Sequence, residues 1–379
     1  MNYQTNLLAV MLCACSLGAQ GTARVSATPS LEEVRKGMGI PSTAEVRGQQ
    51  DIVGFASRVE QMAQVWKLSD LPPLPETFGH VPAAEIVGAI CPHDDYLFAG
   101  RVYRRIVPLV TARTVVLIGV FHKYRRFAAK NQMIFDPYRA WRSPDGEIKV
   151  SDLREEVLKV LPKADFTQDA ACHDSEHSLE AIAYWLKHQR TDVEILPVLL
   201  PSASFERLHE MASELGVALA AAMKRRGLAL GKDVAVIISS DGVHYGADFN
   251  HTPFGAGGVE AYTKAMEVER KLLQGPLAGI VTREKTKAFF EACVNPEQPD
   301  DYRLPWCGRF SIPFGMLLLK TTAQELGIPI IKGFPVAFGN SVDTPELPVK
   351  PLGLGATAPA NLYHFVAYPG VVFTAGKKE

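Results

Sequence analysis

The stretch Cys91-Pro92-His93-Asp94-Asp95-Tyr96-Leu97-Phe98-Ala99-Gly100 joins two regular elements and decides the fold. Before it, residues 83–91 form an apolar run that favours a buried strand, and after it residues 101–110 favour a helix. One turn between them holds a histidine, two carboxylates and a tyrosine hydroxyl. In open α/β sheets, ligands bind where strands end at their carboxyl side, so this turn is a candidate site. Asp94 and Asp95 are also common turn formers, which requires no binding role.

This unit of strand, turn and helix is repeated along the chain. Apolar runs rich in β-branched residues predict strands at residues 114–120, 193–200 and 234–238. Helices are predicted at residues 100–110, 177–188 and 205–224. The alternation predicts an α/β fold in which helices flank a mostly parallel or mixed central sheet, with right-handed crossovers.

The remaining elements complete one domain. Helices are predicted at residues 257–273, 282–292 and 310–326, and closing strands at residues 330–337 and 363–373. A loop rich in proline and glycine, residues 343–359, separates the closing strands. We therefore predict a single α/β domain over residues 83–375. Residues 28–82, with one predicted helix at 54–65, form an N-terminal segment that leads into it.

The composition is that of a globular protein without a nucleic-acid partner. Apolar residues make up 47% and charged residues 21% of the 379 residues, and the formal net charge is -1. Nucleic-acid-binding proteins usually carry a basic stripe, and this chain has no long basic run. It also has no P-loop, dinucleotide fingerprint or nucleophile elbow, which argues against a nucleotide cofactor and a serine-esterase mechanism.

Residues 1–27 differ from the rest of the chain and predict a signal peptide or a lipoprotein signal. Residues 7–17 are apolar, of signal-peptide length and too short to span a bilayer, although no Lys or Arg precedes them. Leu12-Cys13-Ala14-Cys15 resembles a bacterial lipobox, in which Cys15 would carry the lipid. We expect an exported protein, periplasmic or anchored to the membrane only through Cys15. Without such a signal the protein would be cytoplasmic.

Three histidines follow three different predicted strands by a few residues. His93 follows residues 83–91, and His122 and His244 follow the strands predicted at 114–120 and 234–238. Parallel strands bring such positions to one edge of a sheet, so the three imidazoles could converge. A single histidine after a strand is more often a turn or packing residue. Three in comparable positions favour a site.

Cys307 directly precedes the helix predicted at residues 310–326. A cysteine at a helix N-terminus has a lowered thiol pKa, because the helix dipole favours the thiolate. Two imidazoles and a thiolate would suit a mononuclear iron, copper or zinc site with open coordination positions. The alternative is a small buried hydrophobic residue, the commoner role of a free cysteine. A disulfide at Cys307 would exclude the metal site.

Two more polar side chains are expected near this edge of the sheet. His177 and Glu180 are three residues apart on the helix predicted at 177–188, and therefore lie on one helix face. From there they could orient the ligands of a metal through hydrogen bonds. Helix capping by Asp174 or Ser175 would explain much of the same stretch.

Taken together, these residues resemble the Memo family, also called AmmeMemoRadiSam system protein B. Pro92-His93-x-x-Tyr96 with Gly100 resembles the family's Pro-His-Ala-Gly-Tyr…Gly motif, and Ile118-Gly119-x-x-His122 resembles Leu-Gly-Pro-Ser-His-His. The other matching segments are Trp141-x-Ser143-Pro144-x-Gly146-Glu147, Glu176-His177-Ser178-Leu179-Glu180, Ser239-Ser240-Asp241-x-x-His244-Tyr245-Gly246 and Cys307-Gly308-Arg309. The six motifs occur in order over residues 84–340.

The resemblance implies a fold and a site. The family's fold is similar to the catalytic subunit of class III extradiol dioxygenases, which use mononuclear non-haem iron. Carried over by position, it implies His93, His122 and Cys307 as ligands of a divalent metal, with iron favoured over copper or zinc. It also implies His244 as the acid–base residue, with Asp241 beside it. Tyr96 fits the family pattern and is expected among the catalytic residues.

Two classes of function remain open. The first is a dioxygenase-like oxidoreductase that acts on a small molecule, and the second is a protein that binds metal or a peptide without turnover. The sequence indicates no particular oligomeric state. A metal-dependent phosphohydrolase, suggested by the pairs His93-Asp94 and His173-Asp174, is disfavoured because such enzymes are helical and this pattern is rich in strands.

The chain departs from the family pattern beside the first histidine. Asp94-Asp95 replaces Ala-Gly and adds up to two negative charges next to His93. Carboxylates there would raise imidazole basicity, strengthen metal binding or supply an oxygen ligand. Lys123 replaces the second histidine of His-His.

Overall fold

Four parallel strands form the centre of the fold. In the computed structural model, which describes residues 28–73, 75–79 and 84–376, these strands lie in the order β8-β3-β9-β2. Their bounds are β2 Ile86–Cys91, β3 Thr114–Val120, β8 Glu194–Leu200 and β9 Val234–Ser239. All but the first residue of β8 are buried, as expected for strands covered on both faces.

Antiparallel strands extend this centre on one side, and short strands extend it on the other. Beyond β2 the order continues β15-β14-β11, all antiparallel, and beyond β8 it continues β6-β5-β1. The bounds of the strands in this mixed sheet are β1 Val46–Arg47, β4 Met133–Phe135, β5 Ala140–Trp141, β6 Ile148–Val150, β7 Phe166–Gln168, β10 His244–Tyr245, β11 Gly279–Ile280, β14 Ile330–Asn340 and β15 Phe365–Gly376. A separate pair is formed by β12 Val294–Asn295 and β13 Gln298–Tyr302.

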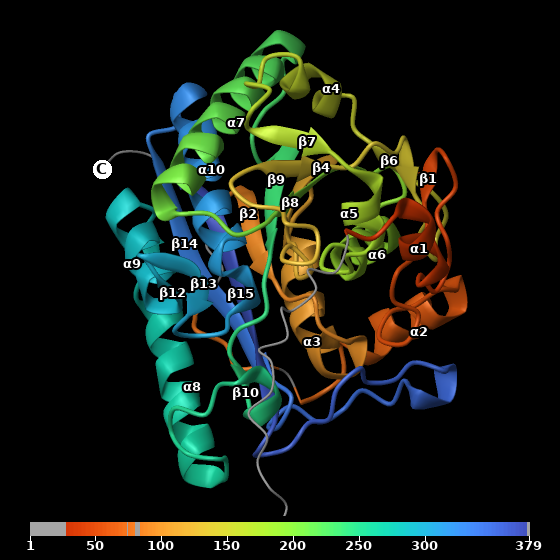
Figure 1. Ribbon diagram of the computed structural model, residues 1–379, viewed down its shortest axis with the longest axis vertical. Coiled ribbons are helices and arrows are strands. Elements are labelled where there is room, and N and C mark those ends of the chain that lie inside the picture. Colours follow the sequence, from red (N-terminus) through yellow and green to blue (C-terminus); the bar gives the residue numbers. More distant parts are fainter. Residues whose placement is uncertain (1–27, 74, 80–83, 377–379) are drawn as a thin grey trace, which may run out of the picture.

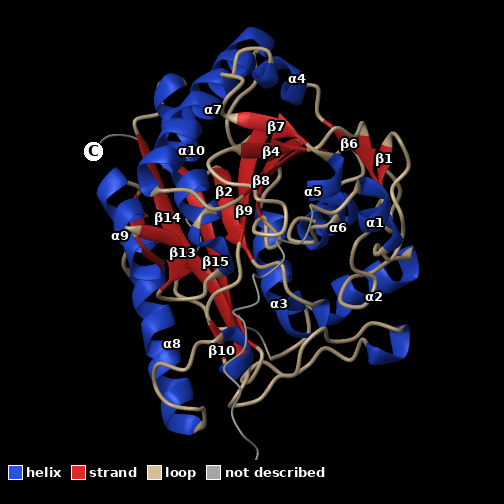
Figure 2. Cartoon of the chain, in the orientation of Figure 1, coloured by secondary structure: helices blue, strands red, loops and turns tan. Residues whose placement is uncertain are grey.

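Helices cover both faces of the sheet (Figures 1 and 2). The α-helices are α1 Leu31–Lys36, α2 Val59–Leu68, α3 Tyr96–Ile106, α4 Leu153–Leu158, α5 Ala170–Asp174, α6 Glu180–Gln189, α7 Phe205–Arg226, α8 Val259–Gln274, α9 Arg283–Cys293 and α10 Ser311–Glu325. Short 3-10 turns lie at Val107–Leu109, Ala247–Phe249, Cys307–Arg309 and Lys350–Leu352.

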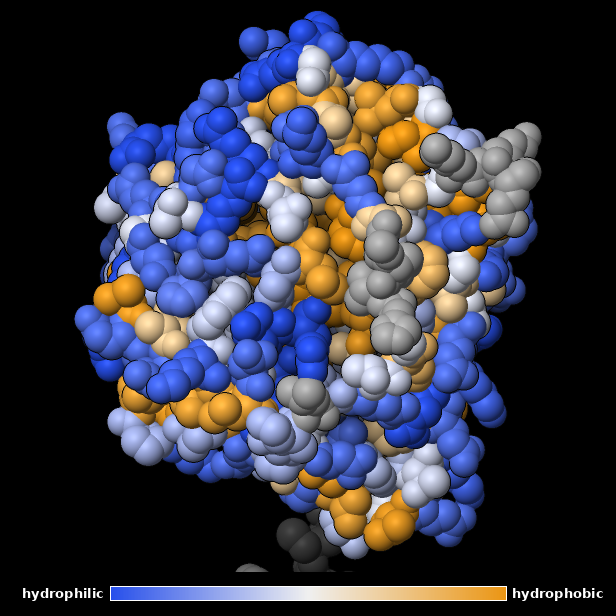
Figure 3. Space-filling model, turned by 180° about the vertical axis from the view of Figure 1, so that it is seen from behind, coloured by the Kyte–Doolittle hydropathy of each residue, from blue (hydrophilic) through white to orange (hydrophobic). Residues whose placement is uncertain are grey.

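Alternating side chains of the strands divide the core into two layers. On β3, Val116 and Ile118 belong to the core layer that includes residues of α7, α8, α9 and α10, whereas Val115 and Leu117 belong to the layer that includes residues of α2, α3 and α6. This period of two places both faces of one apolar strand in a hydrophobic environment. The surface seen from behind is mostly hydrophilic, with hydrophobic residues gathered near its centre (Figure 3).

The predicted α/β fold is confirmed, and the strand predicted at residues 114–120 coincides with β3. Three helix starts were predicted wrongly, and the helix expected at residues 54–65 is α2, which begins at Val59. The helix after β2 begins at Tyr96, because the extended backbone at Asp95 ends the turn there. The helix expected at residue 177 begins at Glu180, since the Glu176 carboxylate accepts the backbone N–H groups of the next two residues and holds them in a turn.

The N-terminal segment is fixed to the domain by a buried ion pair. Strand β1 runs parallel to β5, and Arg47 on it is fully buried. Its guanidinium lies 2.6 Å from Glu180 Oε1, donates to the His173 carbonyl at 2.8 Å, and stacks over Trp141. Glu180 also accepts the backbone N–H of Gln50 at 2.6 Å. Residues far apart in the sequence are thereby joined at one edge of the sheet.

Of the expectations for the N-terminus and the cysteines, only those for Cys91, Cys172, Cys293 and Cys307 concern described residues. The signal predicted over residues 1–27, with Cys15, lies outside the described residues, and the domain bounds stay a prediction. Cys91, Cys172, Cys293 and Cys307 are all free thiols. Within the described part of the chain, no helix has the length and apolar character to cross a membrane.

We predict that Arg47→Met lowers the free energy of unfolding by about 3–5 kcal/mol, because Glu180 would stay buried without its cation. Arg139→Met is the matched control, since Arg139 pairs with Glu45 and Glu147 at an exposed site and should contribute less than about 1 kcal/mol. Urea denaturation of both variants measures the difference. Equal losses in the two variants would contradict the assigned role of Arg47.

Candidate metal centre

The register between two parallel strands builds the first part of the site. Cys91 at the end of β2 pairs with Ser239 at the end of β9. His93 and Asp241 each follow two residues later, and the backbone N–H of His93 donates to Asp241 Oδ1 at 2.9 Å. The polar residues therefore meet at the carboxyl edge of the sheet, where ligands of α/β proteins bind.

The hydrogen bonds of His93 determine which ring nitrogen faces the site. Ser239 Oγ donates to the Ser178 carbonyl at 2.5 Å and lies 2.7 Å from His93 Nδ1. Since a hydroxyl has one hydrogen, Ser239 must accept from Nδ1–H. Nε2 is buried and forms no well-aligned hydrogen bond with a described residue, although Asp241 Oδ2 lies 3.2 Å from it. A buried nitrogen left in this way is a suitable metal ligand.

His122 is also held at Nδ1, in this case by the carboxylate of Glu176. Its Nδ1 lies 2.9 Å from Glu176 Oε1, and its backbone N–H donates to Glu176 Oε2 at 2.6 Å. Its Nε2 lies 3.3 Å from Cys307 Sγ. The ring of His177 stacks on His122 with centroids 5.0 Å apart. We did not predict a role for Glu176, although it is the first residue of the matching Glu-His-Ser motif.

Cys307 and His244 complete the cluster. His244 Nδ1 lies 3.1 Å from the Gly242 carbonyl, and its Nε2 lies 3.5 Å from Cys307 Sγ. The next residue, Gly308, lies so close to β9 that an added Cβ would be 2.2 Å from Ser240 Oγ. Only glycine permits this approach, which holds Cys307 against the carboxyl end of the strand.

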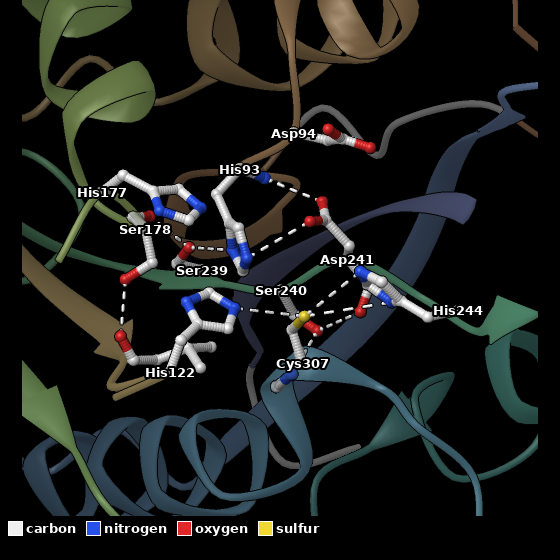
Figure 4. Close-up of polar contacts among 12 residues, drawn as sticks. His93, Asp94, His122, His177, Ser178, Ser239, Ser240, Asp241, His244 and Cys307 are labelled. Carbon is white, nitrogen blue, oxygen red and sulfur yellow. Dashed lines mark hydrogen bonds and ion pairs between the residues drawn. The ribbon is translucent and has the colours of Figure 1, made fainter. Parts of the chain in front are cut away.

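Ligand atoms from separate elements converge at this point (Figure 4). Among the described residues, His93, His122 and Cys307 offer ligand atoms that all lie within 4.8 Å of one another. Asp241, His244 and Cys307 form a second such group, with the thiol in common. Imidazole and thiolate together suit iron, copper and zinc, so these residues fit a divalent transition metal.

Charges in the cluster favour the thiolate. Burial alone would raise the pKa of Cys307, but His244 and His122 outweigh it and hold this pKa well below its usual value. In turn, Cys307 overcomes the effect of burial on His244 and raises its pKa to about 9. We expected a helix N-terminus to be the cause. Cys307 opens a 3-10 turn directly ahead of α10, and the two imidazoles also favour its thiolate.

Asp241 lies near His244, as expected, and it also contacts His93 directly. Its Oδ2 lies 3.2 Å from His93 Nε2, and its Oδ1 accepts the His93 backbone N–H. Burial raises the pKa of Asp241 to about 6, although His93 acts in the opposite direction. Asp241 is therefore the immediate neighbour of His93, while it remains in one group of potential ligands with His244.

Two residues expected in the site point elsewhere. The hydroxyl of Tyr96 donates to the Ala181 carbonyl at 3.4 Å, and its ring packs against Phe55. A catalytic role for Tyr96 has no contact to support it. Glu180, expected to orient a metal ligand, is occupied by Arg47. Each of these residues is the first residue of its helix, and their roles at the site stay predictions.

Asp94 and Asp95 flank the cluster without joining it. Neither belongs to a group of potential metal ligands among the described residues. Asp94 Oδ2 accepts from the Tyr368 hydroxyl at 2.7 Å, and Asp95 Oδ2 accepts the Thr357 backbone N–H at 2.6 Å. Burial and the adjacent Asp94 raise the pKa of Asp95 to about 8.

Glu269 on α8 joins the two loops that carry the cluster. Its Oε1 accepts from Trp306 Nε1 at 2.7 Å, beside Cys307, and its Oε2 accepts the Val243 backbone N–H at 3.2 Å, beside His244. Sequence analysis did not single out Glu269, since nothing in its neighbourhood along the chain signals these contacts. Burial raises its pKa to about 8.

The fold and the cluster define a class of protein, an α/β protein with a candidate mononuclear metal centre at the carboxyl edge of a mixed sheet. The sequence pattern of the family described as "Memo-like protein" matches residues 67–332, which hold every residue of the cluster. The chain belongs to the Memo family, and the resemblance seen in the motifs is confirmed.

Curated relatives are about 30% identical to the chain over the segments that align with it. The MEMO1 family protein of Thermococcus onnurineus is 29% identical over 204 residues, 52% of this chain and 65% of the relative. The MEMO1 family protein of Thermococcus kodakarensis is 30% identical over 198 residues, which are 50% of this chain and 63% of the relative. The MEMO1 family protein of Methanosarcina barkeri is 31% identical over 162 residues, which are 42% of this chain and 55% of the relative. The chain thus spans less than two thirds of the length of these relatives, and the identity of about 30% fits a divergent member.

Glu269 gives a pH-dependent prediction. The folded protein retains a proton on Glu269 up to pH about 8, whereas the unfolded chain releases it near the ordinary value of 4.5. The contribution of Glu269 to stability therefore falls as the pH rises between these values. Relative to Glu269→Gln, the wild type should lose up to about 1.4 kcal/mol per pH unit between pH 5 and 8. Urea denaturation of both metal-free proteins measures this loss, and parallel pH profiles would contradict it.

Proposed function

We propose that this chain is a metal-dependent oxidoreductase acting on a small molecule, with a divalent transition metal held by His93, His122 and Cys307. One observation carries the proposal: each imidazole of the cluster has its Nδ1 held by an acceptor, and the Nε2 atoms gather around one thiolate. Such fixed ring orientations are typical of metal ligands.

His244 is the proton-transferring group in this proposal. Its Nδ1–H is held by the Gly242 carbonyl, so the proton that can move is the one at Nε2, which faces Cys307. Without metal, Asp241 favours protonation of the neighbouring His93, and His93 must release that proton to bind a metal through Nε2. His93 and Asp241 are buried, which strengthens the electrostatic interaction between them, whereas His122 is exposed and His244 is half-buried.

Iron is the metal we favour, with copper and zinc as the competing ions. A bound iron ion would supply one-electron redox chemistry and open coordination positions. The alternative is a protein that binds metal or a peptide through the same residues without turnover. In such a protein, His244 would transfer no proton.

The first test is dioxygen consumption by protein loaded with iron under anaerobic conditions. With catechol-like probes, we expect uptake that His244→Ala abolishes while bound iron, measured by elemental analysis, is retained. Cys307→Ser should lose both. Full iron binding with no uptake for any probe would favour the non-catalytic alternative, and no iron binding by the wild type would refute the metal site.

The second test concerns the carboxylate behind His122. Glu176 accepts four hydrogen bonds, and the amide of Glu176→Gln would place a donor against the N–H groups that face it. We predict a metal affinity about 10–100-fold lower in this variant. Glu147→Gln, at an exposed carboxylate, is the control and should bind metal as the wild type does. Competition with a chromophoric chelator measures both affinities.

A further inference from the structure

An apolar groove of about 470 Å³ lies on the surface between α7 and the segment that follows α4 (Figure 1). Val160, Leu161 and Pro162 form one side of the groove, and residues of α7 form the other. None of the lining residues belongs to the metal centre. The groove requires an explanation, because the outward face of a helix in a globular protein is normally polar.

Apolar side chains of this groove are exposed to solvent. Val160 is 60% exposed and Val217 is 48% exposed. Ala218 and Ala221 follow Val217 on α7 and also line the groove. Their small side chains allow the backbone of another helix to approach α7 closely. Exposed apolar surface in a concave setting indicates a site of protein association.

Ion pairs hold the two sides of the groove together. Arg207, near the start of α7, pairs with Asp165 in the segment after α4. Glu156 on α4 pairs with Arg226 and, at 3.0 Å, with Arg225, both at the end of α7. The segment after α4 is thereby fixed to α7 at two points. The groove therefore has its shape before a partner binds, which lowers the cost of association.

The two charged residues that line the groove have opposite signs and lie at opposite ends of its α7 side. Glu214 and Arg225 are separated by about three helical turns and lie on the same side of α7 as Ala218 and Ala221. Glu214 forms no ion pair with a described residue, and Arg225 shares Glu156 with Arg226. Each of the two can therefore form a further ion pair with a partner.

The resulting surface is complementary to itself. In a two-fold symmetric pair of antiparallel α7 helices, an axis between residues 219 and 220 brings Glu214 against Arg225 of the partner subunit. The same axis brings Ala218 against Ala221 of the partner subunit, so the helices meet at small side chains. Each contact occurs twice, because the axis exchanges the two copies. A second copy of the chain thus matches both the apolar surface and the charges of the groove.

We propose that the groove binds a second copy of this chain, in a two-fold symmetric dimer in which α7 packs against α7 of the partner subunit. Val160 and Val217 of each copy are removed from water against the groove of the other, which favours association. Two pairs of Glu214 with Arg225 fix the antiparallel orientation, since a parallel one would set like charges side by side. The inference is independent of the proposed function, because no residue of the metal centre lines the groove.

Sedimentation velocity of the full-length, metal-free protein tests the dimer. The measurement is made at pH 8, because a hydrogen bond with Asp165 raises the pKa of Glu214 to about 7. We expect dimers whose fraction rises with micromolar protein concentration, and at least about tenfold weaker association of Val217→Asp, which would bury a charge twice. Val259→Asp, at a valine that is 69% exposed on α8, is the control and should dimerise normally. A monomer at every concentration, or equal effects of both substitutions, would overturn the proposal.

Charge reversal tests the antiparallel pairing. Glu214→Arg and Arg225→Glu should each weaken dimerisation at least about tenfold, because like charges would face each other twice. A mixture of the two variants should recover a heterodimer, since each variant then meets the opposite charge at both positions. Circular dichroism shows whether each variant is folded, and a misfolded variant would not recover on mixing. Folded variants that fail to associate in the mixture, or that each dimerise as well as the wild type, would overturn the proposed pairing.

Discussion

The register between β2 and β9 is the constraint on which the site depends. Pairing of Cys91 with Ser239 fixes where both strands end, so His93 and Asp241 leave the sheet side by side. A shift of one residue would turn every side chain of the strand to the opposite core layer. Since both layers are filled by apolar residues packed against helices, the hydrophobic core fixes the position of the polar residues.

Hydrogen bonds at Nδ1 then orient the imidazole rings that the register has placed at this edge of the sheet. His93, His122 and His244 use acceptors of three kinds, the Ser239 hydroxyl, the Glu176 carboxylate and a backbone carbonyl. Folding therefore fixes the orientation of each ring before a ligand binds. The donor atoms need not reorganise on binding, which is the condition for a preorganised site.

Local sequence patterns predicted the strands and the positions of the histidines. They could not assign the residues whose contacts are with distant parts of the chain. The strand at residues 114–120 and the positions of His93, His122 and His244 follow from apolar runs and the turns after them. Glu180 could not be assigned in this way, because its partner Arg47 lies 133 residues earlier in the chain. The same holds for Glu269, whose contacts with Val243 and Trp306 exist only in the folded protein.

The two sides of His93 belong to different parts of the chain. One side faces the thiolate cluster, all of it within the range shared with the Memo family, and the other faces a cavity whose wall is formed largely by residues 37–55, before that range. The buried pair of Arg47 and Glu180 joins the segment that carries this wall to α6. Divergence in such a wall changes which molecule can approach His93, and leaves the metal ligands as they are. A family with one centre can in this way accept chemically different ligands.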